Sequence, residues 1–222
     1  MASPVGLEAL LRWRRGGELV SASEFIPAAE ESGQIVAIGA FVLEEACRQQ
    51  RRLAAAGLDL PVSVNVSARQ LADAAFAEIV GRALERTGTP AERLELEVTE
   101  SLLLGVHGAP AVFHELRRRG VRIAVDDFGT GHSSLSRLRE LPIDRLKIDR
   151  AFVVDLDQRQ ESRVICELVV KLGHALGLKV IAEGVERPAQ DALLRELGCD
   201  EAQGYLYGPP MPVEELVARL GR

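Results

Sequence analysis

The chain has 222 residues, of which 47% are hydrophobic and 27% are charged, and its formal net charge is −6. This composition supports a full hydrophobic core and excludes a disordered chain. Because basic residues are not in excess, polymeric nucleic acid is not an expected partner. The sequence contains no signal peptide and no run of about 18 apolar residues, so we expect a cytoplasmic domain without membrane contact.

The cysteines and histidines argue against a soft-metal site. The three cysteines, Cys47, Cys166 and Cys199, are odd in number and far apart in the sequence. This pattern predicts free, buried thiols in a reducing compartment. The four histidines do not show the spacing of zinc ligands.

The first third of the chain combines a short apolar stretch with two helices and a strand. Leu7–Trp13 is apolar except for Glu8 and Arg12, and residues 8, 10 and 12 would share one face if this stretch is a strand. A surface charge on an edge strand is the alternative explanation of Glu8. Ser23 is expected to cap the next helix. The predicted elements are helices over Glu24–Ser32 and Gln34–Ala56, the second ending near Gly57, and a strand over Leu60–Val66.

The segment Leu94–Thr99 alternates strictly between apolar and polar residues. Glu95, Glu97 and Thr99 share one face, and leucine and valine occupy the other. In an antiparallel sheet the glutamate face would be exposed to water. In a parallel barrel both faces are covered, so a carboxylate near the strand end would need a partner.

Helices and strands alternate through the rest of the chain with mostly short connections. Helices are predicted over Ala72–Thr87 (with Asp73 as cap and Gly88 as stop), Ala109–Arg119, Ser133–Leu141, Glu161–Leu176, Pro188–Leu197 and Val213–Leu220. Strands are predicted over Val121–Val125, Asp144–Ile148, Leu178–Ala182 and Ala202–Leu206. This alternation is typical of a parallel sheet, and the number of units favours an α/β barrel over an open sheet.

Several polar residues fall at or near the carboxyl ends of predicted strands, where α/β barrels place their active sites. Two adjacent aspartates, Asp126 and Asp127, follow the strand Val121–Val125 and precede a glycine-rich turn. Taken alone, this pair is explained equally well as a solvated strand end. The other members are Asn65, Glu97, Lys147 and Glu183, with Gln203 as a further candidate. Their shared position predicts a functional site.

The chemistry of these side chains favours a site for hard cations. Carboxylate and amide oxygens suit Mg²⁺ or Mn²⁺ rather than zinc. Adjacent aspartates allow one carboxylate to bridge two ions, and an ion pair ~3.5–4 Å apart is the usual arrangement for in-line attack on phosphorus. Lys147 adds a positive charge for the phosphate or the nucleophile, and Glu183 is a candidate general base. These residues predict a metal-dependent phosphoester hydrolase, without indicating its substrate.

The sequence resembles the EAL-domain phosphodiesterases that hydrolyse cyclic di-GMP. The resemblance runs from about residue 6 to the C-terminus. The matching segments are Glu8–Trp13, Glu24–Pro27, Ser63–Ser67, Glu97–Ser101, Asp126–Gly131, Leu146–Asp149, Ala182–Glu186 and Gln203–Leu206. Each segment alone is only suggestive, but the complete set in this order is highly specific.

The resemblance implies a fold and a reaction. The fold would be a TIM-like (β/α)8 barrel formed by a single domain over residues 1–222. The reaction would open one phosphodiester bond of cyclic di-GMP to give linear pGpG, with two ions of Mg²⁺ or Mn²⁺ as cofactors.

The resemblance also implies residue roles. Glu8, Asn65, Glu97 and Asp126 would bind the first metal, and Asp126 and Asp127 the second. Glu183 would be the general base, Lys147 would hold the attacking water, and Asp127 would belong to the catalytic group. Arg12, Asp149 and Gln203 would contact the substrate. Glu100 would steady the loop after Asp127, which in this family couples dimerisation to metal binding.

Two departures from the family pattern stand out. Only seven residues precede Glu8, so the family's first, antiparallel strand is expected to be missing and the domain to be N-terminally truncated. His132 stands where the family usually has tyrosine. Because of the missing strand, a cyclic di-GMP receptor with weak or no turnover is the alternative function. A homodimer and a place within a larger multidomain signalling protein are further expectations from the family.

Overall fold

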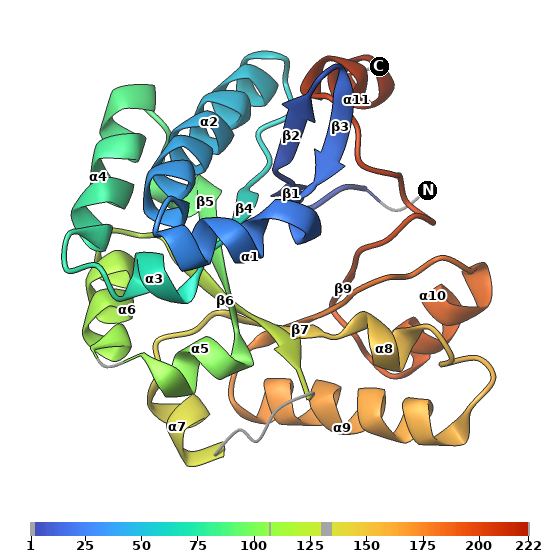
Figure 1. Ribbon diagram of the computed structural model, residues 1–222. Coiled ribbons are helices and arrows are strands. Elements are labelled where there is room, and N and C mark those ends of the chain that lie inside the picture. The colour runs from blue at the N-terminus through green and yellow to red at the C-terminus, as the bar shows by residue number, and fades with distance from the viewer. Residues whose placement is uncertain (1–2, 107, 130–134, 222) are drawn as a thin grey trace. The chain divides into compact units, whose positions relative to one another are not determined.

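The computed structural model describes residues 3–106, 108–129 and 135–221. The chain forms two compact units (Figure 1). Unit one comprises Met1–Glu97, Val106–Arg122 and Met211–Arg222, and unit two comprises Val98–Gly105 and Ile123–Pro210. Thr130, Gly131 and His132, which belong to the predicted glycine-rich loop, lie outside the described residues. Within the described ranges, no helix has both the length and the apolar character needed to cross a membrane.

Unit one is built on three parallel strands in the order β1-β4-β5. Its strands are β1 (Leu7–Ala9), β2 (Arg12–Arg15), β3 (Glu18–Ser21), β4 (Val62–Asn65) and most of β5 (Leu94–Thr99), which passes into unit two after Glu97. Its helices are α1 (Ala22–Ser32), α2 (Ile35–Ala55), α3 (Ala68–Leu71), α4 (Phe76–Thr87), the 3-10 turn η1 (Ala91–Arg93), α6 (Ala109–Arg118) and α11 (Val213–Leu220). The helix α2 packs against α4, α3 and β4.

The helices of unit one begin and end at residues with clear local reasons. Helix α1 starts at Ala22, two residues earlier than the sequence predicted. The capping box is formed by Ser21 and Glu24, so Ser23 is not the cap residue. Helix α4 ends at Gly88, which adopts the left-handed conformation with φ of 67°. The predicted helix Ala72–Thr87 is wrong at its start, because the Asp73 carboxylate accepts a hydrogen bond from the Ala75 amide in a turn between α3 and α4.

The expectation that residues 8 and 12 share one strand is wrong. Glu8 lies in β1, whereas Arg12 lies in β2, which pairs antiparallel with β3 in a separate two-stranded hairpin (Figure 1). Gly16 and Gly17 have positive φ values of 58° and 94° and form the turn between the two strands. The residues on this hairpin are mostly exposed, so it contributes little to the core.

Unit two carries four parallel strands in the order β6-β7-β8-β9. Its strands are β6 (Arg122–Phe128), which enters the unit at Ile123, β7 (Arg145–Ile148), β8 (Lys179–Ala182) and β9 (Glu201–Ala202). Its helices are α5 (Glu100–Gly105), α7 (Leu135–Glu140), α8 (Arg150–Val153), α9 (Gln160–Ala175) and α10 (Pro188–Glu196). Helix α9 packs on β7 and β8, and its Gly173 meets the Val180 side chain so closely that a Cβ atom there would clash. The sequence did not predict α5 or α8.

Strand β5 decides between the two explanations of the alternating segment Leu94–Thr99. The strand has the predicted bounds, and both of its faces are buried, with Glu95 only 4% and Glu97 only 2% exposed. Its pairing with β4 is parallel. A water-exposed glutamate face is therefore excluded, and the prediction of a covered parallel sheet is confirmed. Among the described residues, antiparallel pairing is found in the β2–β3 hairpin and every other paired register is parallel.

The three cysteines are free thiols, as predicted. Cys47 and Cys166 are buried, and burial raises the pKa of each thiol to about 11. Cys199 is only partly buried by exposure of the whole residue, but burial of its thiol group raises the pKa to about 12. These thiols are therefore structural rather than reactive groups.

Candidate metal and catalytic centre

In unit one, three predicted metal ligands lie on neighbouring parallel strands. Asn65 is the last residue of β4 and is in register with Glu97 of β5. The Asn65 amide Nδ2 donates a hydrogen bond to Glu8 Oε1 of β1 over 2.8 Å. Two carboxylates and one amide thus stand side by side on β1, β4 and β5, and they are the oxygen donors that Mg²⁺ and Mn²⁺ prefer. We refer to Glu8, Asn65 and Glu97 as the unit one ligand group.

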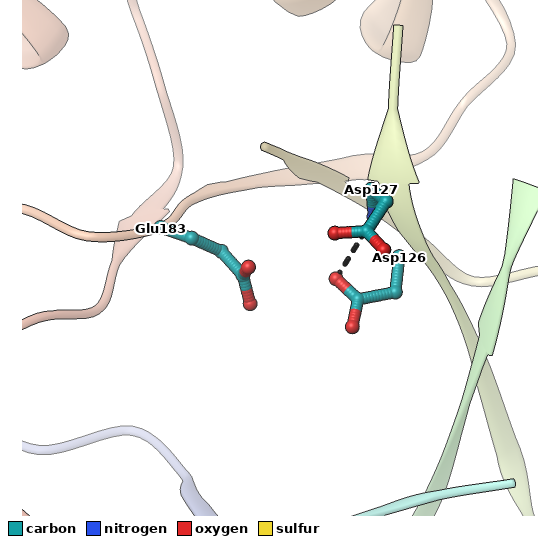
Figure 2. A group of neighbouring side chains, drawn as sticks. All are labelled: Asp126, Asp127 and Glu183. Carbon is teal, nitrogen blue, oxygen red and sulfur yellow. Dashed lines mark hydrogen bonds between the residues drawn. The ribbon is translucent and has the colours of Figure 1, made fainter. Parts of the chain in front are cut away.

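In unit two, three carboxylates converge on one point. Asp126, Asp127 and Glu183 each offer an oxygen atom, and these atoms all lie within 4.8 Å of one another. Figure 2 shows Glu183 extending from the end of β8 toward the aspartate pair on β6. Together with Lys147 of β7, these residues form what we refer to as the unit two acidic group. The strand ends bring together residues that are 56 positions apart in the chain, as the sequence predicted.

Lys147 holds the unit two acidic group together. Its ammonium lies 3.3 Å from Asp126 Oδ1 and 2.5 Å from Glu183 Oε1, and its side chain is only 1% exposed. A buried ammonium is costly unless it is paired, and these two carboxylates supply the pairing. Three carboxylates still face one lysine, so the group carries a negative excess that a bound cation would neutralise.

A bulge in β6 aims both aspartates at the site. Adjacent residues of a regular strand point to opposite faces of the sheet. Against β7, however, Val125 pairs with Leu146 and Phe128 pairs with Ile148. Between these pairs β6 has two residues, the aspartates, where β7 has one, so β6 contains a β-bulge there. Asp127 takes a left-handed φ of 54°, and its amide donates to Asp126 Oδ1 over 3.0 Å. The prediction that the strand ends at Asp126 is therefore wrong, because β6 continues to Phe128.

The environment of Asp127 raises the pKa of its carboxyl group. Burial, a hydrogen bond with Asp149 and the negative charges of Asp126 and Asp149 raise the Asp127 pKa to about 6, while Lys147 opposes the shift. The contact with Asp149 was not predicted from the sequence, which assigned Asp149 to substrate binding alone. A divalent cation at these oxygens would favour the ionised form.

Glu100 contacts the segment that follows the aspartate pair. Its side chain is buried, and Oε2 accepts a hydrogen bond of 3.0 Å from the Gly129 amide. Gly129 has φ of 102°, and a Cβ atom there would lie 3.0 Å from the Phe152 ring. This contact agrees with the predicted position of Glu100, while its effect on the following loop stays a prediction.

The residues predicted to contact substrate lie on three different elements. Arg12 is exposed on β2 and donates to the Leu11 carbonyl. Asp149 caps α8 by accepting a hydrogen bond from the Ala151 amide. Gln203 follows β9, and its backbone pairs with Ala182 and Val185. Asp149 and Gln203 thus belong to unit two, and Arg12 belongs to unit one.

Comparison with known proteins identifies a family. The EAL domain family model matches residues 2–210 of the chain. The chain is 44% identical over 217 residues to "Bifunctional diguanylate cyclase/cyclic di-GMP phosphodiesterase MucR" of Pseudomonas aeruginosa, covering 96% of this chain and 32% of that protein. It is 40% identical over 210 residues to "Cyclic di-GMP phosphodiesterase PdeR" of Escherichia coli, covering 93% of this chain and 32% of that protein.

Solved structures show the same fold. The structure titled "PaMucR Phosphodiesterase, c-di-GMP complex" matches with a TM-score of 0.92 and 44% identity, covering 96% of this chain and 87% of that chain. The structural relatives are TIM-like α/β barrels, which confirms the predicted fold class. The chain spans about a third of the length of the two curated relatives named above.

Proposed function

The chain belongs to the EAL domain family, and from this premise we propose that it is a metal-dependent phosphodiesterase that hydrolyses cyclic di-GMP to linear pGpG. The observation that carries the proposal is the convergence of Asp126, Asp127 and Glu183 around the buried ammonium of Lys147. Relatives at 40% and 44% identity are named as cyclic di-GMP phosphodiesterases, which supports the choice of substrate.

The donor chemistry of both groups fits two hard divalent cations, Mg²⁺ or Mn²⁺. The unit one ligand group would contribute Glu8, Asn65 and Glu97, and the unit two acidic group would contribute Asp126 and Asp127. The negative excess beside Lys147 and the raised pKa of Asp127 support a cation there. When bound, the cations would lower the pKa of a water molecule and neutralise charge that develops on the phosphate.

The protein's own residues supply the proton transfer and the positioning. Glu183 accepts the proton of the attacking water as a new P–O bond forms. The P–O bond to a ribose oxygen breaks, its electron pair stays on that oxygen, and solvent water protonates it to the hydroxyl. Lys147 holds Glu183 in place through their ion pair of 2.5 Å and places a fixed positive charge beside the attacking oxygen. Arg12, Asp149 and Gln203 would contact the dinucleotide, and Glu100 would steady the segment after Phe128 through Gly129.

We also place the domain in a larger assembly. The relatives contain additional sequence beyond the region matched here, which supports a place within a multidomain signalling protein. The proposed site of action is the cytoplasm. A homodimer follows from the family resemblance, and sedimentation of the purified protein tests it.

A product assay tests the proposed function. The purified protein is incubated with cyclic di-GMP and either Mg²⁺ or Mn²⁺, and pGpG is measured by chromatography. We expect metal-dependent formation of pGpG that stops when EDTA is added. If the protein binds cyclic di-GMP but forms no product, the proposed enzymatic activity is wrong and the protein is a receptor. If it neither binds cyclic di-GMP nor forms product, a role as a protein-interaction module is the remaining hypothesis.

A further inference from the structure

Gln190 of α10 is a fully buried polar side chain at which two strand-end segments meet. The first segment, Asp149–Val154, follows β7 and contains α8, while the second, Glu183–Arg187, follows β8. Gln190 is 0% exposed and lies in the first turn of α10, where its side chain accepts a hydrogen bond from the backbone of the N-cap residue Arg187. Gln190 lies only seven residues after Glu183. The sequence nevertheless did not single it out, because a polar residue in a helix is usually at the surface.

All the hydrogen-bonding capacity of the Gln190 amide is used to join these segments. Its Oε1 accepts hydrogen bonds of 2.8 Å from the amides of both Glu186 and Arg187. Its Nε2 donates to the carbonyls of Val153 and Val154 over 3.0 and 3.1 Å. A buried amide with four satisfied bonds is a rigid connection, because loss of any bond would leave a buried polar group unpaired.

Surrounding contacts strengthen the same connection. The Arg187 guanidinium donates to Asp157 and to the Val154 carbonyl. Arg150 of α8 forms an ion pair of 2.7 Å with Glu186. Gly184, with φ of 67°, lies so close to the Arg150 side chain that a Cβ atom would be 2.2 Å from it. The two segments therefore contact each other at several points. Figure 1 shows α8, which belongs to the first segment, and α10, which follows the second.

These contacts connect the proposed general base to Asp149. The Glu183 amide donates to the Ile148 carbonyl over 3.1 Å, so the second segment begins beside the residue that precedes Asp149. Asp149 caps α8 and contacts Asp127. A shift of α8 relative to α10 would thus displace Asp149 relative to Glu183, and reactions slow steeply when catalytic groups are displaced by about 1 Å.

We propose that Gln190 is a positioning residue that locks the segments after β7 and β8 into one unit and thereby holds Glu183 in catalytic register with Asp149. This inference rests on the proposed function. Gln190 does not touch the reacting atoms in this role. It acts through the backbone of Glu186 and Arg187 on one side and of Val153 and Val154 on the other.

The test compares Gln190→Met with a matched control, Gln50→Met. Methionine keeps the length and volume of glutamine but removes its hydrogen bonds. Gln50 of α2 is also 0% exposed and donates hydrogen bonds to Asp59 and to the Leu60 carbonyl, but it lies in unit one, outside both segments. Both variants should have a lower melting temperature than the wild type. Assays run well below both melting temperatures then separate positioning from stability.

We expect Gln190→Met to lower kcat for cyclic di-GMP by about tenfold or more, with KM changed by less than about threefold. Gln50→Met should keep kcat within about twofold of the wild type. Hydrogen exchange followed by mass spectrometry should show faster exchange in both residue ranges 150–157 and 184–190 of Gln190→Met, and in neither range of Gln50→Met. An equal loss of kcat in the two variants, or faster exchange in only one range, would overturn the proposal.

A second variant covers the case in which Gln190→Met does not fold. Arg187→Gln removes the contacts with Asp157 at a partly exposed position, so the fold should be retained. We expect a smaller loss of kcat, about threefold, and faster exchange in both ranges. Unchanged kcat and exchange would overturn the proposal. If the wild-type protein does not hydrolyse cyclic di-GMP, the proposed function fails, while the exchange measurement still decides whether Gln190 joins the segments.

Discussion

The two ligand groups of this protein solve the same electrostatic problem in different ways. In the unit two acidic group, a buried lysine balances two of the carboxylates, and a bulge in β6 aims both aspartates in one direction. In the unit one ligand group, a neutral amide bridges to a carboxylate, and the strands β4 and β5 run in regular register. The lysine ammonium stabilises two ionised carboxylates of unit two by direct charge pairing, whereas the Asn65 amide gives Glu8 a hydrogen bond but no charge.

This comparison predicts that unit two carries the chemistry and that unit one mainly tunes metal affinity. Substitutions in the unit two acidic group should therefore cost turnover and, at the lysine, stability. Substitutions in the unit one ligand group should shift the metal concentration that the enzyme needs.

The largest expected effect comes from Glu183→Gln. Glutamine keeps the size of the side chain but does not accept a proton, so turnover should fall by about 10³-fold. Binding of cyclic di-GMP, followed by calorimetry, should change by less than about fivefold because Glu183 does not hold the dinucleotide in this mechanism. Turnover at the wild-type rate would rule out the general-base role.

The next effect is that of Lys147→Met, which removes the internal cation of unit two. Two carboxylates lose their buried partner, and breaking such a pair costs about 3 kcal/mol of unfolding free energy. Urea denaturation without metal measures this loss, and added Mg²⁺ should recover part of it. The control is Lys171→Met, because Lys171 pairs with Glu167 on the exposed surface of α9 and should cost less than about 0.5 kcal/mol. Equal losses in the two variants would show that Lys147 does not stabilise the group.

A third prediction concerns Asn65→Ala in the unit one ligand group. Asn65 is exposed, so the unfolding free energy should change by less than about 1 kcal/mol. The Mg²⁺ concentration for half-maximal activity should rise about tenfold, because one oxygen ligand is lost. A titration of activity against Mg²⁺ measures this shift. If kcat falls at saturating Mg²⁺ while the half-maximal concentration is unchanged, unit one takes part in the chemistry. The predicted division of roles between the two units would then be wrong.

The smallest effect is a pH dependence that originates at Asp127. Its pKa of about 6 lies above its ordinary value of 3.8, so the fold binds the Asp127 proton more tightly than the unfolded chain does. The stability that comes from this group is present at low pH and is lost as pH rises through about 6. Since protons compete with metal, Mg²⁺ affinity should be roughly fourfold weaker at pH 5.5 than at pH 7.5.

Calorimetry of the wild type at these two pH values measures the dependence. Asp127→Asn is the matched variant, because asparagine also tolerates the left-handed φ of this residue. In that variant the part of the stability change between pH 4 and 6 that Asp127 contributes should disappear. An unchanged pH profile would assign the dependence to another group.

Much of the fold was readable from the sequence because local patterns and tertiary packing agree. The alternation in Leu94–Thr99 predicted β5 with its bounds, and Val213–Leu220 matched α11. Glycine stops such as Gly88 ended helices where predicted, since a left-handed residue without a Cβ atom is the least costly way to leave a helix. The hairpin β2–β3 was missed, because its exposed residues carry no apolar periodicity.

The convergence of the unit two side chains was predicted, but their geometry was predicted only in part. That Asp126, Lys147 and Glu183 would meet followed from their positions at the ends of successive parallel strands. That two adjacent aspartates point to the same side did not follow, because regular strand geometry predicts opposite faces. The bulge and the left-handed Asp127 depend on the register against β7, which is a long-range property.

The sequence by itself determined the βα order and the family, and it predicted the candidate ligand and base residues, since these depend on residue type, spacing and chain order. The tertiary structure alone decided which glutamate faces are buried, how the aspartate pair is aimed, that Asp149 reaches Asp127, and that Gln190 joins two strand-end segments. The physical reason is the same in each case: burial and hydrogen bonding depend on partners far away in the chain, and no local pattern in the sequence specifies those partners.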